Sequence, residues 1–215
     1  TAKKEEEPEE PEYPEIDSKK IKLSSPKYGT VYVWHPAYKG KLDDIVVHFH
    51  GYDRDYSKLK KVWRRIKGQK NPPRMKVEDF WKDGHLEEQF RASGHKALFI
   101  VPESSTGNKK GNTVQTDPKG LLRFVQSEIG MNTADKYITV MAHSGGGNSV
   151  ANYWLKDYRV STVILLDALY GTQGDFDKWL KIEGNRLIIV SIPGTRGKHN
   201  EFAKSYNPPT FKEVP

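Results

Sequence analysis

The sequence predicts an α/β fold in which a mostly parallel central sheet lies between two layers of helices. Two observations carry this prediction. Several short runs are almost continuously apolar, which is typical of strands buried on both faces of a parallel sheet. Segments with apolar residues at helical spacing lie between these runs, and such alternation builds a three-layer α/β/α sandwich. The 215 residues are enough for one compact domain of this kind.

The elements can be placed in order along the chain. Residues 30–35 and 44–49 are rich in β-branched and aromatic side chains and are expected to form strands. Strands buried on both faces are expected at residues 97–101, 137–142, 160–166 and 186–192. Amphipathic helices are expected at residues 56–66, 121–129, 148–155 and 176–182. Strands and helices therefore alternate from about residue 30 onward.

Composition and charge divide the chain into two parts. Residues 1–19 are expected to form an acidic, Pro/Glu-rich, disordered lead-in, and residues 20–215 to form the folded domain. Residues 1–17 contain eight acidic residues and two lysines, so the rest carries 33 basic and 20 acidic residues. A body this basic attracts anionic glycans, membrane headgroups or nucleic acid, although the charge could serve solubility alone. Nucleic acid is the weakest of these partners, because RNP-like and zinc-finger patterns are absent.

The composition also excludes several classes of protein. The chain has no Cys, which excludes disulfides, a thiol nucleophile and thiolate metal sites. No apolar run approaches the roughly 20 residues that a transmembrane helix needs. An acidic, Pro-rich spacer before a Cys-free domain would suit an exported bacterial protein, periplasmic or extracellular, with a cytoplasmic location as the alternative.

In an open parallel sheet, the working site lies beyond the carboxyl ends of the strands. The residues that follow the predicted strands are polar, and one segment stands out. Ala142-His143-Ser144-Gly145-Gly146-Gly147 comes directly after an expected strand and directly before an expected helix. A nucleophilic serine at the apex of such a turn needs small neighbours, because the tight backbone leaves little room. The alternative is a Gly-rich turn that binds phosphate, but the Lys of a P-loop is missing.

With this segment, the chain resembles the α/β-hydrolase superfamily of serine hydrolases from about Tyr32 to Ile192. The stretch His48-Phe49-His50-Gly51-Tyr52 is similar to the family's His-Gly segment after the third strand. The resemblance implies an oxyanion hole formed by the backbone amides of Tyr52 or Gly51 and of Gly145. His48 is expected to be a half-buried strand residue, whereas His50 is expected to line the substrate cleft.

The resemblance also implies an acid and a histidine that complete a triad with Ser144. Asp167 follows an apolar strand one position past the nucleophile, where some family members carry the acid. Most members carry it after the next strand, where this chain has no acid; the alternative role of Asp167 is to cap a turn. His199 is the only histidine after Asp167 and is the expected base, unless it is a surface residue of a Lys-rich loop.

The remaining candidates are assigned to the rim of the site. His143 and Glu103 are expected to line the substrate cleft, with Glu103 as a fallback acid. His48, His50 and Asp53 form an H-x-H pattern, but the further ligands of metallo-hydrolases do not follow. We therefore expect neither a metal nor an organic cofactor.

Two hypotheses follow from the sequence. The first is a serine hydrolase that cleaves a carboxylic ester or amide through an acyl-enzyme, with an anionic glycan or cell-wall substrate suggested by the charge. The second is a non-catalytic binding module on the same scaffold that holds an anionic polymer.

Overall fold

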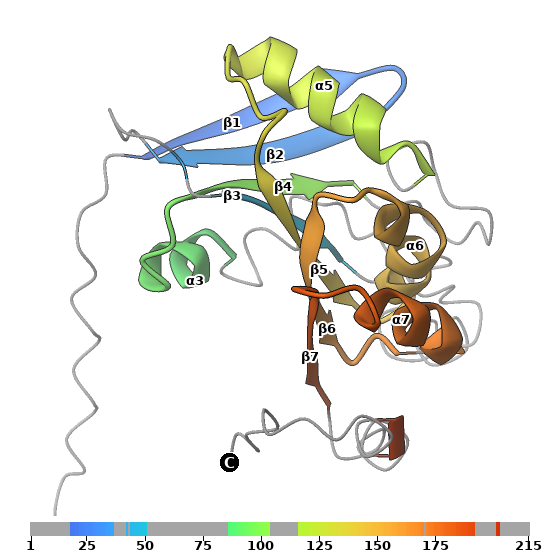
Figure 1. The fold of residues 1–215 in the computed structure, drawn as a ribbon. Helices are drawn as coiled ribbons and strands as arrows, with labels where there is room; N and C mark the ends of the chain where they lie inside the picture. The colour runs from blue at the N-terminus through green and yellow to red at the C-terminus, as the bar shows by residue number, and fades with distance from the viewer. Residues whose placement is uncertain are drawn as a thin grey trace, which may run out of the picture.

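The computed structural model describes residues 18–36, 42, 44–50, 86–103, 116–169, 171–191 and 201–202. These residues build a seven-stranded sheet in the order β1-β2-β4-β3-β5-β6-β7 (Figure 1). The strands are β1 (Ser18–Ser25), β2 (Gly29–Pro36), β3 (Asp44–Phe49), β4 (Ala97–Pro102), β5 (Tyr137–His143), β6 (Val160–Leu166) and β7 (Arg186–Val190).

The sheet is parallel from β4 through β7 in spatial order and antiparallel at its other edge. β1 pairs antiparallel with β2, and β2 pairs antiparallel with β4. All four remaining pairs, β4–β3, β3–β5, β5–β6 and β6–β7, are parallel. The carboxyl ends of β3 to β7 consequently meet at one edge of the sheet, which is where a site is expected.

Helices lie on both faces of the sheet (Figure 1). Helix α3 (Leu86–Ala92) covers one face, where Phe90 packs with Trp34 and stacks on Phe99 at a centroid distance of 4.4 Å. The other face is covered by α5 (Pro118–Ile129), α6 (Gly146–Tyr153), the short helix η1 (Trp154–Lys156) and α7 (Gln173–Leu180). The fold is therefore the predicted three-layer α/β/α sandwich with a mostly parallel central sheet.

Side chains alternate between two cores because successive residues of a strand point to opposite faces. On β3, Ile45, Val47 and Phe49 belong to the core beneath α5, α6 and α7. Val46 belongs to the smaller core beneath α3. Trp154 belongs to the larger core, and its ring packs edge-on against that of Phe49, with the ring centroids 5.2 Å apart. Fully buried aromatic rings thus anchor α6 and η1 to the end of β3.

Helix α5 shows why its boundaries fall where they do. The Asp117 carboxylate accepts a hydrogen bond from the Gly120 N–H at 3.0 Å, and Pro118 occupies the first turn, where its missing N–H costs nothing. Gly130 ends the helix in the left-handed conformation, with φ 69°. The helix thus returns the chain from the carboxyl end of β4 toward the amino end of β5.

Six of the seven strands lie where the sequence predicts strands, but three findings differ from expectation. β1 and α3 were not anticipated. β7 was expected to be buried on both faces, and this was wrong: it is an edge strand, and Ile188 and Val190 are 42% and 48% exposed. The helix expected at residues 56–66 and most of the acidic lead-in lie outside the described residues. No helix in the described ranges is long and apolar enough to cross a membrane.

Candidate active site

Ser144 follows the last residue of β5 and has a left-handed backbone, with φ 50°. This conformation is uncommon for a residue with a side chain, and it costs about 1–2 kcal/mol relative to the usual regions. Such strain persists only where the surroundings fix it, and it concentrates at functional sites. The expected strand–serine–helix junction is therefore present, with Ser144 at its apex.

Hydrogen bonds on both sides hold the Ser144 backbone in place. Its N–H donates to the carbonyl of Leu166 in the next strand at 3.1 Å. Its own carbonyl accepts from the Gly147 N–H at 3.2 Å, within the first turn of α6. Gly145 is the N-cap of that helix, so Ser144 stands at the positive end of the helix dipole. A negative charge that develops beside Ser144 would be stabilised there.

Gly146 packs the start of α6 against the end of β3. A Cβ at this position would lie 3.0 Å from the carbonyl oxygen and 3.1 Å from the Cβ of Phe49. Phe49 directly precedes His50, the residue that opens the predicted oxyanion loop. The small side chain at Gly146 is thus required by a tertiary contact, and this contact brings the ends of β3 and β5 close together.

Asp167 also follows the end of its strand and is also left-handed, with φ 49°. Its N–H donates to the carbonyl of Val190 in β7 at 2.7 Å. The β5–β6 ladder pairs His143 with Leu166, so Ser144 and Asp167 leave adjacent strands at the same level of the sheet. Both residues are half-buried. The structure therefore brings the candidate nucleophile and the candidate acid to neighbouring positions at the carboxyl edge.

Three histidines lie near this edge in different environments. His48 and His50 are almost fully buried, at 5% and 2% exposure, whereas His143 is exposed. The expectation that His48 is half-buried was therefore wrong. Its ring lies beside that of Phe99, on the face of the sheet that carries the smaller core. Burial, together with the nearby His50 and His143, lowers the pKa of His48 to about 3. His48 is consequently neutral at ordinary pH, and its buried Nδ1 has no hydrogen-bond partner in the described structure.

Glu103 follows β4, which is separated from β5 by β3. Its carboxylate accepts a hydrogen bond from the Thr30 N–H at 3.2 Å, and its own N–H donates to the Thr30 carbonyl at 2.9 Å. Glu103 therefore ties the end of β4 to the start of β2. Both of these hydrogen bonds connect Glu103 to β2, which lies on the opposite side of β4 from β3 and β5.

Several candidate residues lie outside the described residues: Gly51 and Tyr52 of the predicted oxyanion loop, the predicted base His199, and Asp53 of the H-x-H pattern. Within the described ranges, no group of three or more His, Asp or Glu side chains could hold a metal ion.

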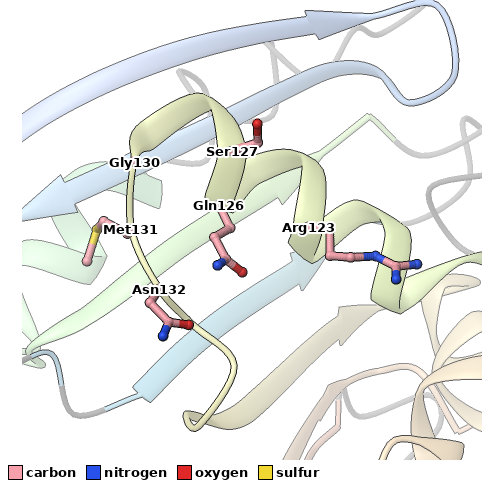
Figure 2. A pocket seen from close by; sticks show the side chains of 6 residues that line it. All are labelled: Arg123, Gln126, Ser127, Gly130, Met131 and Asn132. Carbon is pink, nitrogen blue, oxygen red and sulfur yellow. The ribbon is translucent and has the colours of Figure 1, made fainter.

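A pocket of about 400 Å³ lies far from this site. It is lined by the last turns of α5 and the residues directly after it, from Arg123 to Asn132 (Figure 2). Because α5 runs back toward the amino ends of the parallel strands, this pocket is at the edge opposite Ser144. It therefore adds nothing to the candidate site.

The reason for the third of three consecutive glycines is a tertiary contact that the sequence does not reveal. Gly147 is the third, and a Cβ there would overlap the carbonyl oxygen of Ala168, the residue after Asp167. The only signal in the sequence was the length of the glycine run, which exceeds what the turn at Ser144 requires.

Comparison with known proteins finds similarity to solved structures alone. No protein-family model matches the chain, and no curated protein matches it. Among solved structures, a ferulic acid esterase is similar over 72% of this chain, with 13% identity and a TM-score of 0.49. A carboxyl esterase from the mycorrhizal fungus Tuber melanosporum is similar over 72% of this chain, with 13% identity and a TM-score of 0.40. The matched parts are 60% and 46% of those two chains, respectively.

Proposed function

We propose that this protein is a serine hydrolase that cleaves a carboxylic ester or amide, with Ser144 as the nucleophile. The observation that carries the proposal is the left-handed backbone of Ser144 between a parallel strand of the sheet and the start of a helix. A serine held in this way presents its hydroxyl beyond the sheet edge, and the N–H groups at the helix start face a developing oxyanion.

The proposed reaction has two halves. Ser144 Oγ attacks the carbonyl carbon while His199 accepts the hydroxyl proton, and Asp167 orients the resulting imidazolium. The backbone amides of Gly145 and of Tyr52 or Gly51 would bind the oxyanion. The tetrahedral intermediate collapses as the C–O or C–N bond breaks and His199 protonates the leaving alcohol or amine. Water then attacks the acyl-enzyme, His199 again accepting the proton, and Ser144 is regenerated.

Asp167 serves as the acid in this scheme because of where its strand ends. Its backbone leaves β6 beside the point at which Ser144 leaves β5, and the Ser144 N–H is bonded to the residue before Asp167. A histidine bridging two such neighbours needs to span only the gap between adjacent strand ends. The acid position after β6 thus suits the nucleophile position after β5.

The charge of the chain guides the proposed substrate class. Beyond residue 17 the chain has 33 basic and 20 acidic residues, so it attracts anionic molecules. An ester or amide on an anionic glycan or a cell-wall polymer fits this charge. If Ser144 proves unreactive, the same charge would support the second hypothesis, a binding module for an anionic polymer.

Covalent labelling tests the proposal directly. The protein is incubated with a fluorophosphonate and analysed by intact-mass spectrometry, alongside Ser144→Ala and His199→Ala. We expect a single adduct on the wild type, none on Ser144→Ala, and labelling slowed by several orders of magnitude on His199→Ala. An unlabelled but folded wild type would contradict the hydrolase. Retained binding of an anionic glycan by Ser144→Ala would then support the binding module.

A further inference from the structure

The first turn of α6 makes an unusually close contact with the residue that follows Asp167. A Cβ at Gly147 would overlap the carbonyl oxygen of Ala168 and would lie 2.9 Å from its carbonyl carbon and 3.2 Å from its Cβ. Both residues are buried, with Ala168 only 1% exposed. The backbone after Asp167 therefore rests directly on the helix, with no side chain between them.

Gly147 is also bonded to the candidate nucleophile. Its N–H donates to the Ser144 carbonyl at 3.2 Å. One residue therefore contacts Ser144 through a hydrogen bond and the segment after Asp167 through van der Waals packing. These two contacts link two parts of the chain that are more than 20 residues apart in the sequence.

Asp167 is held from the opposite side by β7, because its N–H donates to the Val190 carbonyl at 2.7 Å. Its left-handed backbone is thus enclosed between a hydrogen bond to β7 and the contact of Ala168 with α6. The β7 side is the outer edge of the described sheet. The contact with α6 relates Asp167 to Ser144 in addition to the hydrogen bond from the Ser144 N–H to the carbonyl of Leu166.

We propose that Gly147 is a positioning residue that sets the location of the Asp167 carboxylate relative to Ser144. This inference rests on the proposed function, in which Asp167 orients the catalytic histidine. A side chain at position 147 would displace the Ala168 carbonyl and, with it, the backbone of Asp167. Because a misplacement of about 1 Å in a catalytic group can cost about 10²-fold in rate, this displacement would be felt in the chemistry.

The chain offers a matched control for this substitution. Gly174 is also helical, in α7, and a Cβ there would meet nothing within 4 Å. Gly174→Ala therefore makes the same chemical change without a clash. Gly146→Ala is a second comparison, because it crowds Phe49 at the end of β3 rather than the segment after Asp167.

The first measurement is amide hydrogen exchange by NMR, which does not depend on activity. We expect Gly147→Ala to speed exchange of the Asp167 N–H by at least about tenfold, because the backbone that forms its hydrogen bond is displaced. Exchange of the Ile138 N–H, which donates to the Arg159 carbonyl at 2.8 Å, should be unchanged, as should all sites in Gly174→Ala. Unchanged exchange at Asp167 in Gly147→Ala would overturn the proposal.

The second measurement is the rate of fluorophosphonate labelling in a double-mutant cycle. Gly147→Ala should slow labelling by about 10²-fold alone but by less than about threefold in the Asp167→Asn background, since both changes act through one carboxylate. Gly146→Ala should retain its full effect in that background. Full additivity of Gly147→Ala with Asp167→Asn would overturn the proposal.

A pH profile separates positioning from a loss of structure. A displaced carboxylate stabilises the imidazolium less, so the pKa of the catalytic histidine should fall. The pH below which the labelling rate declines should therefore be lower in Gly147→Ala than in the wild type. A merely destabilised protein would keep the wild-type pH dependence, and that result would count against positioning.

Two further outcomes are distinguishable. If Gly147→Ala does not fold, Ala168→Gly tests the same contact from the other side; it adds no atom and should also speed exchange at the Asp167 N–H. If the wild type is not labelled, the proposed function fails, and the exchange comparison still decides whether Gly147 positions Asp167.

Discussion

Ser144 and Asp167 leave neighbouring strands in the same way. Each directly follows the last residue of its strand, and each has a left-handed backbone, with φ 50° and 49°. Each donates its N–H to the last carbonyl of the next strand, Leu166 for Ser144 and Val190 for Asp167. The parallel ladder therefore continues one hydrogen bond beyond both strands, although the backbone has already turned away from the sheet.

The two junctions differ in the structure on their C-terminal sides. After Ser144, helix α6 begins within two residues, so the serine is fixed by the helix's own hydrogen bonds. After Asp167, the chain passes through Ala168 and Leu169 without regular structure, and α7 begins only at Gln173. The position of Asp167 consequently depends on packing against α6 and on β7, an edge strand. Ser144 is thus held by the local structure of α6 in addition to its bond to β6, whereas Asp167 depends on tertiary contacts alone.

The largest effect is expected from Ser144→Gly. Labelling should be abolished and turnover should fall by about 10⁶-fold, because the proposed nucleophile is lost. Glycine adopts a positive φ without strain, so the free energy of unfolding should equal or exceed that of Ser144→Ala, which keeps the strained backbone. Chemical denaturation of the two variants measures the difference. A Ser144→Gly protein clearly less stable than Ser144→Ala would mean that the left-handed backbone at this site is not strained.

Substitutions of Asp167 are expected to rank next. Asp167→Asn should slow labelling by about 10⁴-fold and leave the free energy of unfolding almost unchanged, since Asn tolerates the left-handed region. Asp167→Val places a branched side chain there and should cost about 1–3 kcal/mol in stability.

Valine at the two junctions sharpens the comparison. Ser144→Val should lower the free energy of unfolding more than Asp167→Val, because α6 cannot shift as readily as the irregular segment after Asp167. Equal losses in denaturant melts would show that the two backbones are held with equal rigidity, against the difference inferred above.

The fold and the strand–serine–helix junction at Ser144 could be predicted because local sequence patterns indicate both. The apolar runs at residues 97–101 and 137–142 are long enough to indicate strands unaided, and a serine among small residues between a strand and a helix has few other interpretations. β1 was missed because Ile21 and Leu23 are its only apolar residues. α3 was missed because seven residues are too few to show a clear helical period.

Other features depend on contacts that no local pattern records. The composition of β7 is that of a buried strand, and only its place at the edge of the sheet exposes Ile188 and Val190. Gly147 belongs to a glycine run that looks like part of the turn, yet its small size is required by Ala168. Such pairings become visible only when the positions of both partners are known.

The smallest expected effect concerns His48, on the strand beside that of Ser144. In the folded protein its pKa is about 3, below the usual 6.5 of the unfolded chain. Between these two values the unfolded state binds a proton that the folded state does not. The stability contributed by neutral His48 is therefore complete above about pH 6.5 and is lost as the pH falls toward 3, by about 2 kcal/mol at pH 5.

His48→Phe should remove this dependence, because phenylalanine does not titrate and suits the neighbouring ring of Phe99. Its free energy of unfolding should fall less steeply between pH 6.5 and 4 than that of the wild type, as measured by urea denaturation at a series of pH values. His48→Gln is the control: it should share the shallower slope but be less stable throughout, since its amide is buried in an apolar site. Parallel curves for wild type and His48→Phe would show that His48 is protonated as easily in the folded protein as in the unfolded chain. The shallower slope would instead establish that the strand beside Ser144 carries an uncharged histidine. A labelling rate that falls as the pH drops below neutrality must then reflect protonation of a different histidine.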